Sequence, residues 1–237
     1  MRSYSDMGLH GHVVRQLGTR IVQGTLAAGS TLDPDQIGVD FGVSRTVVRE
    51  ALKVLGAKGL VGARPRRGTF VRERSEWSLL DPDVLRWQYD QLGEPPAETL
   101  DKLAEVRLII EPSAAALAAR RRSEADLARL QAALDAMKSS EHDPAGLTES
   151  DVAFHRALLV ATGNEFLAEM AMVIDAGLHV RNRFVHGHDV AMKPSLRAHA
   201  TVLDAVRQRQ PDEAETAMRR LLVAASRDVA RLRRKSG

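Results

Sequence analysis

Three polar side chains interrupt helical stripes of apolar residues in the second half of the sequence. Asp151 and His155 lie four residues apart, so both fall on one face of a helix, and His199 lies in a second apolar stripe. Polar groups that enter an apolar core are costly unless they are paired or bind a metal ion. Carboxylate and imidazole ligands suit a divalent metal ion, with zinc as the first candidate and nickel or manganese as alternatives.

The same spacing allows a second interpretation. Asp151 and His155 could form a buried hydrogen bond, with His199 as an ordinary core histidine whose polar atoms are satisfied nearby. Two arginines, Arg107 and Arg181, also fall in apolar stripes and raise the same question. The residues alone leave a metal site and a buried polar network open.

A site of either kind needs helices that bring these faces together. From residue 98 onward the sequence shows helical periodicity and no strand pattern, with breaks at segments that contain proline or glycine. The expected helices span residues 98–122, 123–139, 148–162, 165–186, 194–209 and 211–234. We expect these six helices to form an antiparallel bundle.

A second group of polar residues lies near the N-terminus. The segment Phe41–Leu55 has the pattern of a helix-turn-helix, with Ser44 as the N-cap of the second helix. Arg45, Thr46 and Arg49 fall opposite its apolar stripe, near the helix N-terminus, where a recognition helix places its base-reading side chains. The arginine fork suits guanine edges, so we expect this helix to bind DNA through Arg45, Thr46 and Arg49, with Ser44 beside them at the DNA.

Two short strands are expected after this helix, at Leu60–Ala63 and Gly68–Val71. The turn between them carries Arg66 and Arg67. With the preceding helices, this hairpin completes a winged helix-turn-helix, and we expect Arg66, Arg67 and Gly68 to contact the DNA backbone or the minor groove. The expected fold is therefore mainly α, with a DNA-binding domain at residues 1–75, a linker with a short helix at 76–96 and the helical bundle at 97–237.

Charge and composition agree with this division. Residues 1–75 hold 12 Lys and Arg against 6 Asp and Glu, whereas residues 76–237 hold 22 against 25. A basic N-terminal segment followed by a mildly acidic remainder is typical of a protein with an N-terminal nucleic-acid-binding domain.

The absence of cysteine excludes disulfides and thiolate metal sites. Because we find neither an apolar run of the ~18–20 residues that a membrane span needs nor a signal peptide, we expect a cytoplasmic protein without a membrane partner.

The N-terminal motifs resemble the GntR-family signature. They include Phe41-Gly-Val-Ser-Arg-Thr-x-Val-Arg-Glu-Ala-Leu52 and Arg67-Gly-Thr-Phe-Val71, and the resemblance covers essentially the first 75 residues. It implies a homodimer on a palindromic double-stranded DNA operator, with four positions at the DNA: Arg45, Thr46, Arg49 and Gly68. Many members carry arginine in the second helix where this chain has Gln36, so a contact at Gln36 is an open question.

The second half resembles the all-helical FCD domain of the FadR-type branch, in Asp151-Val-Ala-Phe154-His155 and the later motif that begins at His199. The resemblance implies metal binding by Asp151, His155 and His199. A further histidine is usual in the last helix, where this chain has Leu221. In this branch the arginine that matches Arg107 faces the effector cavity, and we expect Arg181 to contribute there too.

Within this branch the chain resembles repressors of sugar-acid catabolism, through Trp77-Ser-x-Leu-Asp81-x-Asp-Val-Leu-x-Trp87 and Glu105-Val-Arg107-x-x-x-Glu-Pro112. This resemblance predicts a ligand-responsive transcription regulator that a small carboxylate effector, such as a sugar acid, releases from DNA at a metal-containing pocket. One alternative is the same DNA-binding head with a metal-independent sensor of acyl-CoA or another organic acid. The other is a metalloenzyme, although the sequence offers no obvious activated nucleophile or general base.

Overall fold

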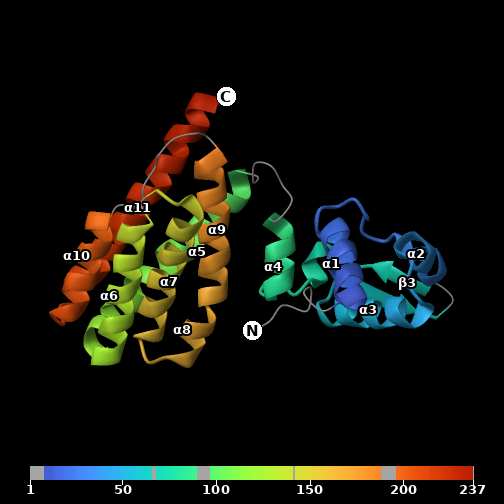
Figure 1. The fold of residues 1–237 in the computed structure, drawn as a ribbon, viewed down its shortest axis with the longest axis horizontal. Coiled ribbons are helices and arrows are strands. Elements are labelled where there is room, and N and C mark those ends of the chain that lie inside the picture. The colour runs from blue at the N-terminus through green and yellow to red at the C-terminus, as the bar shows by residue number, and fades with distance from the viewer. Residues whose placement is uncertain (1–7, 66–67, 90–96, 141, 188–195, 237) are drawn as a thin grey trace. The chain divides into compact units, whose positions relative to one another are not determined.

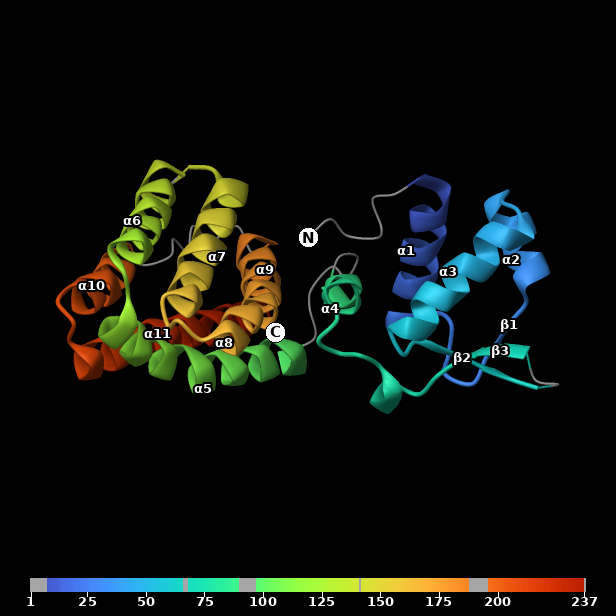
Figure 2. The same ribbon diagram turned by 90° about the horizontal axis from the view of Figure 1, so that it is seen from below.

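The computed structural model describes residues 8–65, 68–89, 97–140, 142–187 and 196–236, and the chain forms two compact units, Met1–Gly93 and Glu94–Gly237. The first unit combines helices with a small sheet, and the second is helical (Figures 1 and 2). Within the described ranges, no helix is both long and apolar enough to cross a membrane.

The first unit is the predicted winged helix-turn-helix. Its described elements are α1 (Gly8–Val22), β1 (Thr31–Leu32), α2 (Pro34–Phe41), α3 (Arg45–Ala57), β2 (Val61–Arg64), β3 (Gly68–Val71), the 3₁₀ turn η2 (Arg74–Glu76) and α4 (Pro82–Tyr89). The strands form an antiparallel sheet in the order β1-β3-β2, in which Val61 pairs with Val71 and Arg64 with Gly68. The strand β1 was not predicted from the sequence, because its two residues are too few to give a periodic signal.

Capping residues place the recognition helix. The side chain of Asp33 accepts the N–H of Asp35 and begins α2, and α2 ends at Gly42, whose φ of 62° lies in the left-handed region. Ser44 then caps α3 by accepting the N–H of Val47 at 3.4 Å, as the sequence predicted. The apolar stripe of α3 is buried in the core of this unit, so its opposite face is left at the surface.

The helix α4 packs on α1 within the same unit. The ring of Trp87 is 1% exposed and lies so close to α1 that a Cβ on Gly18 would fall 2.3 Å from it. At the start of α4, Nζ of Lys58 lies 2.9 Å from Asp81 and 2.7 Å from Asp83. Lys58 is the C-cap of α3, so these ion pairs join the recognition helix to the start of α4.

The second unit is a helical bundle. Its described helices are α5 (Ala97–Arg121), α6 (Glu124–Ser139), α7 (Pro144–Val160), α8 (Glu165–Glu169), α9 (Ala171–Gly187), α10 (Leu196–Arg207) and α11 (Pro211–Ser236). Helix α5 packs against α11 and α6 against α7, and both views show α6, α7 and α9 side by side (Figures 1 and 2).

The prediction of a single helix over 165–186 was wrong. Helix α8 ends at Glu169 and α9 begins at Ala171, so the described part of this unit has seven helices instead of six. Helix α7 also begins earlier than predicted, because Asp143 caps it and Pro144 occupies its first turn.

Candidate functional site

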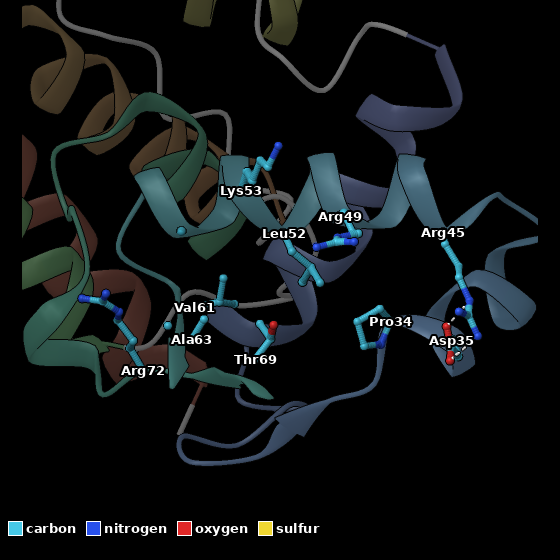
Figure 3. Close-up of a pocket in the computed structure, with 12 residues that line it drawn as sticks. Pro34, Asp35, Arg45, Arg49, Leu52, Lys53, Val61, Ala63, Thr69 and Arg72 are labelled. Carbon is cyan, nitrogen blue, oxygen red and sulfur yellow. Dashed lines mark hydrogen bonds and ion pairs between the residues drawn. The ribbon is translucent and has the colours of Figure 1, made fainter. Parts of the chain in front are cut away.

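The exposed face of α3 borders a hollow of about 700 Å³ that α2 and the sheet complete. Four cationic side chains line it: Arg45, Arg49, Lys53 and Arg72. Asp35 is the one carboxylate among its lining residues. Figure 3 shows the hollow with Arg49 inside it and Arg45 at its edge. A concave basic surface beside a recognition helix is suited to a phosphate backbone.

Arg45 is held by Asp35 through two parallel contacts (Figure 3). Its Nε lies 2.5 Å from Oδ1 of Asp35, and its Nη2 lies 2.6 Å from Oδ2. Gln36, for which the sequence left a DNA contact open, donates to Asp40 at 2.7 Å. The sequence did not predict Asp35 as the partner of Arg45, because the ten-residue separation crosses the turn between two helices.

The other residues predicted to bind DNA belong to α3 and the wing. Thr46 is exposed on the first turn of α3, beside Arg45. Gly68 begins β3 with a φ of 74°, a conformation that favours glycine at the tip of the wing. Arg66 and Arg67 lie outside the described residues.

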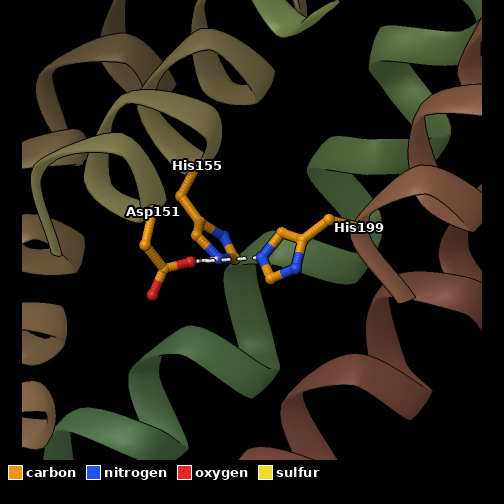
Figure 4. Close-up of side chains that lie close together, drawn as sticks. All are labelled: Asp151, His155 and His199. Carbon is orange, nitrogen blue, oxygen red and sulfur yellow. Dashed lines mark hydrogen bonds and ion pairs between the residues drawn. The ribbon is translucent and has the colours of Figure 1, made fainter. Parts of the chain in front are cut away.

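In the second unit, the three predicted metal ligands lie together (Figure 4). Asp151 and His155 on α7 face His199 on α10, and one ligand atom from each lies within 4.8 Å of the others. Oδ1 of Asp151 is 3.1 Å from Nε2 of His199 and 3.4 Å from Nε2 of His155. All three side chains are buried. Burial works against the charge of Asp151, yet hydrogen bonds from the two imidazoles hold its pKa well below the usual value.

Two residues of α5 complete this cluster. Glu111 is fully buried and accepts a hydrogen bond from Nδ1 of His155. Arg107 donates from Nε to Glu111 at 2.6 Å, and its Nη2 lies 3.2 Å from Nε2 of His155. Glu111 was not predicted to take part in the site, although its spacing of four residues from Arg107 places both on one helix face.

The donor set fits a divalent metal ion. A tetrahedral ion with bonds of ~2.0–2.2 Å keeps its ligand atoms about 3.4 Å apart, close to the two separations around Asp151. Glu111 supplies the carboxylate that usually orients a metal-binding imidazole from its far nitrogen. Arg107 lies against Nε2 of His155, so a metal ion would compete with its guanidinium for that atom. Leu221 is buried in the apolar core and offers no fourth ligand.

A small cavity of about 50 Å³ lies beside this cluster, between α5, α9 and α11. Both predicted effector-binding arginines, Arg107 and Arg181, line it. Arg181 donates to Asn182 at 2.8 Å and lies 4.0 Å from Asp151, and among the described residues its Nε has no hydrogen-bond partner. Burial lowers the pKa of Arg181, and the charge of Arg107 adds to this effect, whereas Asp151 and Asp228 compensate only in part. The cavity is therefore lined by two guanidinium groups, of which Arg107 pairs with Glu111, and by one carboxylate, Asp101, which pairs with Arg233.

Comparisons with known proteins match both units. The model of the bacterial regulatory proteins of the gntR family matches residues 9–71, and the FCD domain model matches residues 102–224. The galactonate operon transcriptional repressor of Escherichia coli (strain K12) is 32% identical over 217 residues, which cover 91% of this chain and 94% of that protein. The transcriptional regulator LutR of Bacillus subtilis (strain 168) is 32% identical over 211 residues, which cover 84% and 90%.

A solved structure of Lar, described as controlling the expression of the Listeria monocytogenes agr system, aligns with a TM-score of 0.66 over 95% of this chain and 98% of its own. At 18% identity it supports the fold alone. The sequence relatives are named as transcription regulators, which excludes the metalloenzyme alternative. The chain is a DNA-binding transcription regulator and belongs to the GntR family, in the branch that carries an FCD domain.

Proposed function

We propose that this regulator is a homodimeric repressor of an operon for the catabolism of a sugar acid or another small carboxylate, and that this carboxylate releases it from DNA. The proposal rests mainly on two arginines that line one cavity next to the Asp151 cluster: Arg107, which is buried, and Arg181, whose side chain is 14% exposed. The names of two relatives agree with this class of effector, since one is the galactonate operon repressor and another is the repressor NanR of Salmonella newport (strain SL254), 32% identical over 210 residues.

Two arginines and one carboxylate line the cavity, and because that carboxylate, Asp101, is paired with Arg233, the remaining charges favour an anionic ligand. A buried guanidinium costs free energy unless its donors are satisfied, and Nε of Arg181 has no partner within the described ranges. A carboxylate that accepts from Arg181 would satisfy that donor with a charge-assisted hydrogen bond. Arg107 would offer a second guanidinium, from α5.

The size of the cavity implies a coupled rearrangement. Ligand pockets usually measure ~300–1,000 Å³, whereas this cavity measures about 50 Å³. A sugar acid therefore needs α5, α9 and α11 to move apart. An effector that binds only the widened bundle shifts the protein toward that state, which gives a physical route from binding to a changed arrangement of the dimer.

Asp151, His155 and His199 would hold a divalent metal ion, zinc first, with nickel or manganese as alternatives. Such an ion would act as a Lewis acid and attract a carboxylate or hydroxyl oxygen of the effector. Glu111 keeps Nε2 of His155 directed toward the other two ligands.

On the DNA side, each protomer of the proposed homodimer presents Arg45, Thr46, Arg49 and the wing to one half-site of a palindromic operator. Half-sites one helical turn apart require a fixed spacing between the two recognition helices. A change of that spacing on effector binding would release the DNA. Because such a regulator acts where the DNA is, we assign it to the cytoplasm.

The test is a thermal-shift screen of sugar acids and other small carboxylates, with and without a chelator, followed by a gel shift on the DNA upstream of its own gene. A true effector raises the unfolding temperature, because it binds the folded state, and releases the DNA. Loss of both effects with chelator supports the metal. If an acyl-CoA releases the DNA, and still does so in the presence of chelator, the result would instead support the metal-independent sensor.

A further inference from the structure

We infer that Asp35 is a positioning residue for sequence recognition: it orients the guanidinium of Arg45 so that its free edge reads a guanine in the operator. The inference rests on the DNA binding of the family and on the Asp35–Arg45 pair, and it does not depend on the proposed effector.

The geometry of the pair leaves the required edge free. Asp35 occupies the side of the guanidinium formed by Nε and Nη2. A guanidinium has five N–H donors in one plane, so the hydrogens on Nη1 and the second hydrogen on Nη2 remain. Those on the end of the fork point in parallel, which is the arrangement that binds O6 and N7 of guanine. The carboxylate therefore fixes the plane of Arg45 without using its reading edge.

Stability does not account for this ion pair. The side chains of Arg45 and Asp35 are 76% and 55% exposed, and ion pairs this accessible to solvent contribute little to folding. What the pair changes is the freedom of a long side chain at the start of the recognition helix. Holding that side chain in one direction reduces the ordering cost of binding one particular base.

The charge of Asp35 acts in the same direction. It is the one carboxylate among the residues that line a hollow with four cationic side chains. Near DNA a carboxylate repels phosphates, so Asp35 weakens binding to any sequence, whereas its contact with Arg45 strengthens binding to the matching sequence. Both effects increase the ratio of specific to non-specific affinity.

The same helix offers a matched control. Asp40 is also an exposed carboxylate of α2, but it accepts from Gln36 and does not line the hollow. Removing Asp40 changes the net charge as much as removing Asp35 does, without freeing Arg45.

The experiment first selects the preferred site of the full-length protein from a pool of random-sequence duplexes. Dissociation constants are then measured at one salt concentration for every single-base variant of that site and for a non-specific duplex, with the wild type and with D35A, D35N, R45A and D40A. In the wild type, replacing the guanine read by Arg45 should weaken binding about 5- to 150-fold.

We expect D35A and D35N to reduce this discrimination several-fold at the position that R45A also affects, and to leave discrimination at the other positions intact. D35A should also bind the non-specific duplex more tightly, and D40A should keep the wild-type pattern at every base. D35N preserves the shape of the side chain, so the same measurements on D35N test the inference if D35A does not fold.

Three results would overturn the inference. One is a uniform loss of affinity across all sites in D35A and D35N, which indicates a merely structural role. Another is a change at a position that R45A does not affect, which indicates that Asp35 reads a base itself. The third is a selected site in which no guanine depends on Arg45.

Discussion

Glu111 accepts a hydrogen bond from Nδ1 of His155, and the opposite nitrogen of that imidazole lies 3.4 Å from Asp151. Burial raises the pKa of Glu111, but Arg107 and His155 outweigh it and lower the pKa to about 2. Glu111 is therefore ionised at neutral pH and must accept, so Nδ1 of His155 donates. The ligand atom of His155 is consequently Nε2, the nitrogen that lies beside Oδ1 of Asp151.

The variant E111Q tests this orienting contact. We expect the affinity for zinc to fall about 10- to 100-fold, although all three ligands remain, because loss of the outer carboxylate costs this much in other metal sites. Competition with a chromophoric chelator measures the change. E105Q, an exposed position on the same helix, should bind zinc as the wild type does. Equal affinities for E111Q and the wild type would show that Glu111 does not orient His155.

Removal of the metal should separate DNA binding from release. We expect H155A and chelator-treated wild type to lose bound metal, to keep operator binding, and to remain on DNA when effector is added. Elemental analysis and a gel-shift titration with effector measure the three effects. H142A replaces an exposed histidine and serves as the control. If H155A still releases DNA at the wild-type effector concentration, the metal has no part in sensing.

The variant R181M tests the anion-binding wall of the cavity. Hydrogen bonds to charged groups contribute ~1.5–3 kcal/mol, so we expect about 10- to 150-fold more effector to be needed for release. Without effector the unfolding temperature should not fall, since the Nε atom of Arg181 is buried without a hydrogen-bond partner among the described residues and burial opposes the charge of its guanidinium. R183M, at an exposed position of α9, should respond normally. A wild-type effector response in R181M would place the carboxylate elsewhere.

The Lys58 ion pairs predict a pH dependence at the alkaline end. Burial lowers the pKa of Lys58, but Asp83 and Asp81 outweigh it, so the folded-state pKa is raised above 10.5. A raised pKa means that the pairs stabilise the folded state fully below pH 10.5 and that this contribution disappears as the pH rises through the folded-state pKa. The difference in free energy of unfolding between wild type and K58M, measured by urea denaturation, should therefore shrink above pH 10.5. A difference that does not change with pH there would contradict this assignment.

The sequence predicted those features that rest on local periodicity and capping. The stripe of α3, its N-cap Ser44 and the Asp151–His155 face each depend on residues within one turn of one another. The pairing of His199 with this face was one of two interpretations that the residues allowed, and the family resemblance favoured it, because a contact between residues 48 positions apart has no local signal.

The missed features show the limits of that approach. Glu111 lies one turn from Arg107 and could have been found by asking which neighbour satisfies a buried guanidinium. Asp35 was out of reach, since its contact depends on the angle between α2 and α3. The division between α8 and α9 at Met170 was also out of reach, because neither proline nor glycine marks it.

The contact of Trp87 with Gly18 decides where the chain can be shortened. A fragment that ends at Val71 would keep the recognition helix and the wing but would strip α1 of the indole that covers it, leaving an apolar patch open to water. A fragment that retains α4 keeps that surface closed and also keeps the carboxylates that neutralise Lys58. A minimal DNA reader, detached from its sensor, should therefore be cut after Gly93, where the first unit ends.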